Sequence, residues 1–290
     1  MAVKVITDST SYVPRELRRE LDVGVAGLSS LLDGVTYNDD AEDYEPFYTA
    51  LEASSAMPTT SQPAVQDMVD LMEERVAAGH EVVGVFISEK MSGTYSTATL
   101  ARGMVLERHP DAVIEVVDSE GNCMELGFAA LAAARAAAAG EAVDAVVAAA
   151  LRMVERTRLL FVPETLEFLR RGGRIGGASA LVGSLLQIKP ILTVVNGQTD
   201  VFSKVRTKQK AVGTIVGTLA TDMREKGGLG GVIVHHIHDE AAGRDLAARV
   251  ADVVGHPVDI HPIGPAIGAH VGPGAVAVVY HTVDPMRKSG

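Results

Sequence analysis

Three short runs of hydroxyl-bearing and small residues contain the side chains of this sequence that are best suited to bind a ligand. They are Pro58–Pro63 (Pro-Thr-Thr-Ser-Gln-Pro), Ser88–Tyr95 (Ser-Glu-Lys-Met-Ser-Gly-Thr-Tyr) and His270–Gly274 (His-Val-Gly-Pro-Gly). The first two stand where a strand or helix gives way to a new helix. Hydroxyl groups and free backbone N–H groups at helix starts form an anion-binding surface. We therefore expect a neutral, hydroxyl-lined pocket for an acidic headgroup.

The first run places Thr59, Thr60 and Ser61 between two prolines that restrict the local backbone. Pro63 suits the first position of a helix, which makes Ser61 or Gln62 the expected N-cap. One interpretation is a simple capping turn. The functional interpretation is that one hydroxyl caps the helix while its neighbour faces a ligand.

The second run follows Val82–Ser88, which we interpret as a buried strand that leads through a loop into a helix. Ligands of open α/β sheets bind at the carboxyl ends of strands, where such loops gather. Ser92 is therefore a candidate hydroxyl donor, with the amides of Gly93 and Thr94 beside it. Gly93 would allow a ligand to approach the backbone closely. A plain N-cap role for Ser92 is the alternative, and it does not exclude ligand contact.

The third run places His270 in a Gly-rich turn before the last expected strand. A histidine outside a sheet core is more often structural or exposed than functional, so His270 carries little weight in isolation. The Gly-Pro-Gly that follows it would fix a tight loop and hold the imidazole in place. An imidazole can donate a hydrogen bond to a carboxylate, so we keep His270 as a headgroup candidate.

A local basic cluster stands out in an acidic chain. Lys204 and Arg206 are two residues apart near an expected strand and are therefore expected on one face, and Lys208 and Lys210 follow. Edge strands commonly carry solvated lysines, which is the structural explanation. The functional alternative is a docking surface or a phosphate clamp.

A histidine-rich strand end, with His235, His236 and His238, raises the possibility of a metal site. The spacing does not match the H-E-x-x-H pattern of zinc proteases. Asp239 is explained as the N-cap of the next helix. We expect no metal here, and no cofactor elsewhere in the chain.

Composition narrows the class of protein. The chain has 290 residues, of which 47% are hydrophobic and only 4% aromatic, so any cavity would have mostly aliphatic walls. Its formal net charge of -11 opposes binding to nucleic acids and to anionic lipid surfaces. Cys123 is the single cysteine, so no intrachain disulfide is possible. With no signal-peptide pattern and no transmembrane run in the sequence, we expect a soluble cytoplasmic protein.

Strands alternate with helical patterns, which predicts an α/β fold with a largely parallel sheet. Strands are expected at Val3–Thr7, Val82–Ile87, Val113–Val117, Leu159–Val162, Pro190–Val195, Val201–Val205, Gly231–His235, Val258–Ile260 and Ala275–Tyr280. Helices are expected after Pro14, Glu45, Pro63, Ser92, Met124, Ala142, Glu164, Ala178, Thr207 and Glu240. Asn196-Gly197 predicts a hairpin, and hence a mixed sheet, in the second half. We place a domain boundary at Gly140, giving domains 1–140 and 141–290.

Taken together, a collinear set of motifs covers nearly the whole chain. They are Thr7–Thr10, Thr59–Pro63, Ser92–Tyr95, Val117–Ser119, Leu166–Ile175, Ile188–Leu192, Lys204–Thr207 and His270–Gly274. In this order they resemble the DegV family of bacterial fatty-acid-binding proteins. Three positions depart from the family pattern: Gly176 and Ala64 replace serines, and Cys123-Met124-Glu125 replaces Ser-Met-Gly. These departures concern acyl-chain preference more than the headgroup.

The resemblance implies two α/β domains, the first with a mostly parallel sheet covered by helices on both faces and the second with a mixed sheet. It implies one long-chain fatty acid bound between or within them, with Thr60, Ser61 and Ser92 at the carboxylate and His270 close by. It also implies a non-catalytic role as the acyl-carrying subunit of a fatty acid kinase that supplies phospholipid synthesis. A separate ATP-binding subunit would phosphorylate the acid, with Arg206 near the carboxylate's exit or the docking face.

Two alternatives from the residues stay open. A serine acyl-hydrolase would use Ser92 as nucleophile and His270 as base, although no G-x-S-x-G elbow is present. A metal-dependent enzyme would use His235, His236 and His238. Gly172–Gly177 does not match a phosphate loop, and we interpret it as a structural hinge between helices.

Overall fold

The computed structural model describes residues 2–181 and 188–286. Its internal contacts divide the chain into two compact units. The first unit comprises Met1–Ser29 and Ser61–Val154, and the second comprises Ser30–Thr60 and Glu155–Gly290. This division differs from the expected one at residue 140, because residues 141–154 group with the first unit and residues 30–60 with the second. Whether 1–140 and 141–290 behave as folding domains stays a prediction.

The first unit is built on a four-stranded sheet in the order β2-β1-β6-β7, with every neighbouring pair parallel. Its strands are β1 (Val3–Asp8), β2 (Gly24–Ala26), β6 (Glu81–Phe86) and β7 (Ile114–Asp118). Because the strands are parallel, their carboxyl ends meet at one edge of the sheet, at Asp8, Phe86 and Asp118. The predicted parallel sheet of the first half is confirmed; only the short strand β2 was not expected.

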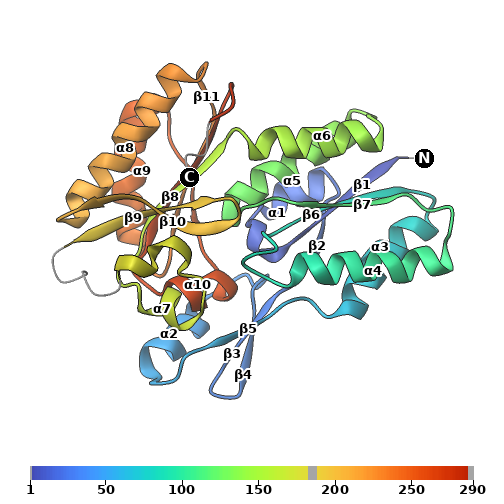
Figure 1. Cartoon of the computed structure of the whole chain (residues 1–290), viewed down its shortest axis with the longest axis horizontal. Helices are drawn as coiled ribbons and strands as arrows, with labels where there is room; N and C mark the ends of the chain where they lie inside the picture. The colour runs from blue at the N-terminus through green and yellow to red at the C-terminus, as the bar shows by residue number, and fades with distance from the viewer. Residues whose placement is uncertain (1, 182–187, 287–290) are drawn as a thin grey trace. The chain divides into compact units, whose positions relative to one another are not determined.

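Helices cover both faces of this sheet, as predicted (Figure 1). The helices of this unit are α1 (Arg15–Glu20), α3 (Val65–Ala77), α4 (Thr94–Arg108), α5 (Cys123–Ala138) and α6 (Val143–Val154), with the 3-10 turn η1 (Ser9–Ser11). Helices α3 and α4 pack together over Ile6 and Val82 and bury Met68 and Ala101. Helices α5 and α6 pack together and also contact β1 and β6. The alanine-rich sequence of α5 permits this close packing.

The second unit contains a six-stranded mixed sheet in the order β10-β9-β8-β13-β11-β12. Its strands are β8 (Thr157–Val162), β9 (Lys189–Val195), β10 (Gln198–Val205), β11 (Leu229–His236), β12 (Ile260–Pro262) and β13 (Val276–Thr282). Only β11 and β12 pair in parallel; the other pairs are antiparallel. The predicted hairpin joins β9 to β10 at Asn196 and Gly197, which both have positive φ as a type I′ turn requires.

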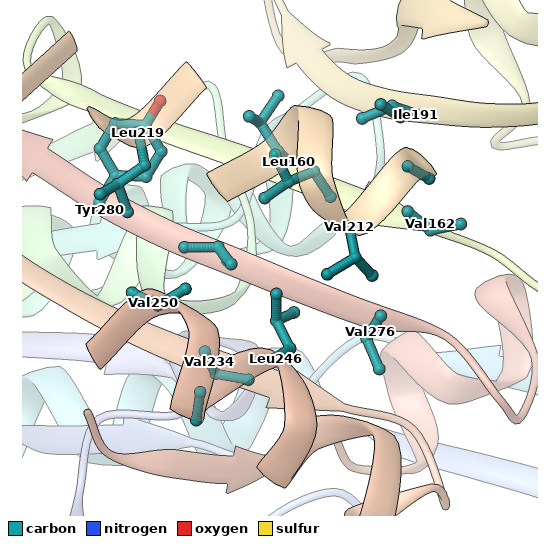
Figure 2. Close-up of a cluster of buried hydrophobic side chains, with 14 of the residues drawn as sticks. Leu160, Val162, Ile191, Val212, Leu219, Val234, Leu246, Val250, Val276 and Tyr280 are labelled. Carbon is teal, nitrogen blue, oxygen red and sulfur yellow. The ribbon is translucent and has the colours of Figure 1, made fainter. Parts of the chain in front are cut away.

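One face of this mixed sheet is covered by α8 (Lys208–Glu225) and α9 (Glu240–Val254). Figure 2 shows Leu160 and Val276 of the sheet facing Val212 of α8 and Leu246 of α9. Each of these side chains is almost completely removed from water. Burying a side chain of this size contributes about 1.5–3 kcal/mol, so this cluster is the main apolar core of the second unit.

Residues 30–60 form a small separate layer within the second unit. A three-stranded sheet in the order β4-β3-β5 is made by β3 (Ser29–Leu32), β4 (Val35–Asn38) and β5 (Thr59–Ser61), and α2 (Glu45–Ala53) lies between β4 and β5 in sequence. The three strands were not predicted, because each has only three or four residues. Their importance is local: β5 carries the threonines of the first motif.

Three further helical segments complete the second unit. They are α7 (Glu167–Arg171), the 3-10 segment η2 (Gly176–Leu181) and α10 (Pro265–Val271). Helix α10 was not expected from the sequence. The helix predicted after Ala178 begins as the 3-10 segment, and residues 182–187 lie outside the described residues.

The length and polarity of the described helices decide whether any of them could cross a bilayer. A membrane-spanning helix needs about 20 mostly apolar residues. Helix α8, with 18 residues, includes Lys208, Lys210, Asp222 and Arg224. Within residues 2–181 and 188–286, no helix has the length and apolar character needed to cross a membrane.

Candidate functional site

The loop between β6 and α4 presents Ser92 and Thr94 as a bonded pair. Their hydroxyl oxygens are 2.9 Å apart, and the Thr94 amide donates to Ser92 Oγ at 3.3 Å. Thr94 is buried, whereas Ser92 is half-buried. The helix N-cap is Gly93, so the alternative interpretation of Ser92 as the capping residue is off by one residue, although its oxygen does accept from a helix-start amide. The pair offers neutral donors at the start of α4.

Gly93 is required by packing within the protein itself. A Cβ atom at this position would lie 1.9 Å from Gln62 Oε1. The Gln62 side chain is fixed there because its Nε2 donates to Thr97 Oγ1 at 2.7 Å. The space beside the Gly93 Cα, which was predicted to admit a ligand, is therefore occupied by the Gln62 side chain.

The first motif is a strand and not a helix cap. Thr59–Ser61 form β5, and α3 begins at Val65 with Ala64 as its N-cap. The prediction that Ser61 or Gln62 caps this helix is wrong. Consecutive residues of a strand point to opposite faces, so Thr60 and Ser61 are directed differently. Ser61 is exposed and Thr60 is half-buried.

Thr60 meets His270 directly. Thr60 Oγ1 and His270 Nε2 are 2.9 Å apart, which brings together the first and third motifs from 210 residues apart in sequence. His270 lies in the last turn of α10, not in the predicted turn. Gly172 makes room for its ring, since a Cβ there would lie 2.3 Å from His270 Nδ1.

Burial keeps the imidazole of His270 neutral at pH 7. Desolvation, with a smaller effect of the Arg174 charge, lowers the pKa of His270 to about 4. Nδ1 is buried and has no hydrogen-bond partner within the described residues. In the tautomer with its proton on Nε2, the neutral imidazole would donate to Thr60 Oγ1. The Thr60 hydroxyl hydrogen is then available for a further acceptor.

Two residues that the sequence did not suggest support α10. Asp39 Oδ1 accepts from the Ala266 amide in the first turn of this helix at 2.7 Å, and Asp39 is almost fully buried. Tyr48 donates to the Ile263 carbonyl at 2.7 Å just before the helix. Both lie more than 200 residues away in sequence, so local pattern carried no signal for them.

The basic cluster separates into bonded and exposed members. Lys208 donates to the Gly274 carbonyl at 3.1 Å and lies near Glu164 and Asp239. Lys204 and Arg206 are exposed. Strand β10 ends at Val205. The alternation of side chains between the two faces of the strand therefore does not extend to Arg206. The strand gives no support to the prediction that Lys204 and Arg206 share a face.

The histidines of β11 have separate partners. Buried His235 shares a hydrogen bond with the His261 carbonyl at 3.1 Å, and desolvation lowers its pKa to about 3. His238 stacks on Tyr48 and lies 3.5 Å from a carboxylate oxygen of Glu45. No group of three metal-ligating side chains converges within the described residues. Asp239 caps α9 as predicted, accepting from the Ala242 amide.

The residues required by the hydrolase alternative also have other partners. Ser92 Oγ pairs with Thr94 Oγ1, and His270 Nε2 pairs with Thr60 Oγ1. Asp118, the carboxylate at the end of β7, accepts from the backbone amide of Glu120 at 2.8 Å.

Comparison with known proteins gives a consistent answer. A family model described as "Uncharacterised protein, DegV family" matches residues 2–283. The chain belongs to the DegV family. A DegV domain-containing protein of Clostridium acetobutylicum is 45% identical over 291 residues, covering 99% of this chain and 100% of that protein. The predicted family is therefore confirmed.

Solved DegV structures share the fold. A DegV family protein from Thermus thermophilus, described by its fatty acid binding, has a TM-score of 0.86 and 31% identity and covers 98% of this chain and 100% of its own. DegV from Bacillus subtilis, described as a fatty acid binding protein, has a TM-score of 0.83 and 31% identity, with coverage of 97% and 99%. The α/β fold predicted for both halves is the DegV fold.

Proposed function

We propose that this DegV protein binds one long-chain fatty acid and holds its carboxylate through hydroxyl groups and backbone amides. The groups assigned to the carboxylate are Thr60, Ser61, Ser92, Gly93, Thr94 and His270. Family membership and the fatty-acid-binding DegV neighbours support the ligand class. Among these residues Ser61 has the weakest geometric support, because it is exposed and points to the opposite face of β5 from Thr60.

The observation that carries the proposal is the bond between Thr60 and His270. It pairs a hydroxyl with a neutral imidazole, and a proton on Nε2 would leave the hydroxyl hydrogen for an anion. The Ser92–Thr94 pair offers the same chemistry at the start of α4. Uncharged donors satisfy a carboxylate without forming a fixed ion pair, so the headgroup stays available for a later reaction.

The energetics allow tight binding on these terms. A sixteen-carbon acid has about fourteen methylenes, and burying them at about 0.8 kcal/mol each contributes about 11 kcal/mol. Association and ordering oppose this by at least about 4 kcal/mol. A carboxylate buried without partners would cancel much of the remainder, so the donors decide whether the acid binds.

The protein then serves as a non-catalytic carrier. It presents the bound acid to a separate ATP-dependent fatty acid kinase subunit, which converts it to acyl phosphate for phospholipid synthesis. Exposed Lys204 and Arg206 are the proposed contacts for the kinase or the departing headgroup. Reconstitution with such a kinase tests this step: Arg206→Ala should slow acyl phosphate formation while palmitate affinity stays unchanged.

The binding itself is tested by calorimetric titration of delipidated protein with palmitate. Loss of one neutral hydrogen bond costs about 1 kcal/mol, so Ser92→Ala should weaken binding about fivefold and Thr60→Val similarly. Thr99→Ala is the matched control for Ser92→Ala, because Thr99 is exposed on α4 and its hydroxyl donates to the Tyr95 carbonyl of that helix. Thr59→Val, on the other face of β5, is the control for Thr60→Val. Unchanged affinity in both Ser92→Ala and Thr60→Val would reject the assigned carboxylate site.

A further inference from the structure

Two sequence motifs are left without a role by the proposed function. Thr7–Thr10 spans the end of β1, and Val117–Ser119 spans the end of β7. These strands are the two neighbours of β6, from which the Ser92 loop leaves the sheet. Each motif contains an aspartate, and each aspartate bonds the backbone of that loop.

Asp8 uses its two oxygens for two different tasks. Oδ1 accepts from the Thr10 amide at 2.9 Å and from Thr10 Oγ1 at 2.5 Å, which closes the turn after β1. Oδ2 accepts from the Ile87 amide at 2.8 Å, at the first residue after β6. Asp8 is fully buried, and burial raises its pKa to about 6.

The donor pattern explains why an aspartate stands here. An asparagine could close the Thr10 turn with its oxygen, but its amide nitrogen would then face the Ile87 N–H group, donor against donor. Burying a carboxylate is costly, and the turn alone does not require it. The second oxygen therefore serves the loop.

Asp118 acts from the other side of β6. Its Oδ1 accepts from the Glu120 amide at 2.8 Å, and its Oδ2 accepts from the Glu89 amide at 3.4 Å. The same segment is tied further by the Ser88 amide, which donates to the Gly121 carbonyl at 3.0 Å. The loop after β6 is thus bonded to both flanking strand ends.

The tether reaches Ser92 through one tight turn. The Ser88 carbonyl accepts from the amides of Met91 at 3.0 Å and Ser92 at 3.1 Å. Holding residues 87–89 in place therefore also holds the Ser92 hydroxyl in its position at the start of α4. We propose that Asp8 and Asp118 are positioning residues that pre-organise the Ser92 loop for its anionic ligand. This inference rests on the proposed function for the ligand, but the tether itself is independent of it.

Pre-organisation of this kind strengthens binding by lowering the entropy lost when the ligand docks. Asp8→Asn tests it, because the asparagine keeps the Thr10 turn and removes only the acceptor for Ile87. Thr10→Val is the matched control: it removes the hydroxyl bond to Asp8 and leaves the Ile87 bond in place. Amide hydrogen exchange, palmitate titration and unfolding free energy are measured on the wild-type protein and on each variant.

In Asp8→Asn, exchange at Ile87 and Ser92 should accelerate about tenfold relative to Val83 in β6, and palmitate should bind about tenfold more weakly. Thr10→Val should leave both quantities within about twofold of the wild-type values, whatever its loss of stability. Asp118→Asn should show a smaller effect of the same kind, about threefold, because its loop bond is longer.

The proposal is overturned if Asp8→Asn leaves Ile87 exchange and palmitate affinity unchanged, or if Thr10→Val weakens palmitate binding as much. Should Asp8→Asn fail to fold, Asp118→Asn decides by the same criteria. If the wild-type protein binds no palmitate, the proposed function fails. Exchange at Ile87 in the variants still decides whether the aspartates hold the loop.

Discussion

At the scale of single residues, the charge state of His270 decides how this side chain could take part in the proposed carboxylate site. Its pKa of about 4 keeps the ring neutral across the physiological range, so no imidazolium–carboxylate ion pair is preformed. Its Nε2 lies 2.9 Å from Thr60 Oγ1. In the tautomer protonated at Nε2, the ring would be a neutral donor to Thr60 and would leave the Thr60 hydroxyl hydrogen for another acceptor.

This role can be separated from a charge role by substitution. His270→Gln keeps a neutral N–H donor, so palmitate affinity should fall no more than about threefold, whereas His270→Ala should lose about tenfold. Titration calorimetry at pH 7 measures both. A cation requirement is revealed instead if glutamine and alanine weaken binding equally and lysine restores it.

Asp8 gives the protein a predictable pH dependence. Its pKa is about 6 in the folded state against 3.8 as the ordinary value, so the folded protein binds this proton more tightly than the unfolded chain. The contribution of Asp8 to the free energy of unfolding is fully present below about pH 4 and is lost as the pH rises to about 6. At about 1.4 kcal/mol per pKa unit, the loss is about 3 kcal/mol.

Urea unfolding from pH 4 to pH 7 of the wild-type protein and of Asp8→Asn measures this loss. The difference between the two proteins cancels the other titrating groups, and it should change by about 3 kcal/mol in favour of the variant as the pH rises. A pH-independent difference would contradict the assignment of the raised pKa to Asp8.

At the scale of elements, short α10 depends on distant support. It has seven residues, and its first turn is capped by Asp39 from the end of β4. Helices this short are marginal by themselves. The orientation of His270 in the last turn therefore depends on a residue that never contacts it.

Removing this support should affect stability and the site together. Asp39→Ala should cost about 1–2 kcal/mol of unfolding free energy, as for other lost N-caps, and should shift the imidazole resonances of His270. Asp39→Asn keeps an acceptor oxygen and should restore both. Denaturant unfolding and histidine NMR provide the readouts; an unchanged His270 spectrum in Asp39→Ala would show that α10 is held without this cap.

The same elements show what the sequence could and could not predict. The strands with five or more residues carried a clear β-branched pattern and were predicted, and so was the Asn196-Gly197 hairpin. Strand β5 was mistaken for a helix cap because its flanking prolines also suit a helix start. Helix α10 was missed because glycine and proline at both ends mimic a turn.

At the scale of the whole molecule, the sequence indicates which residues make up the candidate site but not how they are arranged. Collinear motifs indicated Thr60, Ser92 and His270, and family membership follows from the same motifs. Which of these groups bond one another depends on contacts over long sequence separations, such as Thr60 to His270 and Asp39 to Ala266. No local pattern encodes such pairs. The same holds for Asp8, whose partner Ile87 lies 79 residues away.

The central claim is that the folded chain carries one fatty acid. Native mass spectrometry of freshly purified protein, followed by denaturation and lipid identification, tests it most directly. We predict one added mass per chain equal to a long-chain fatty acid, lost on denaturation and restored when delipidated protein is given palmitate. Protein that stays at its sequence mass of 30.4 kDa, both as purified and after incubation with palmitate, would contradict the account.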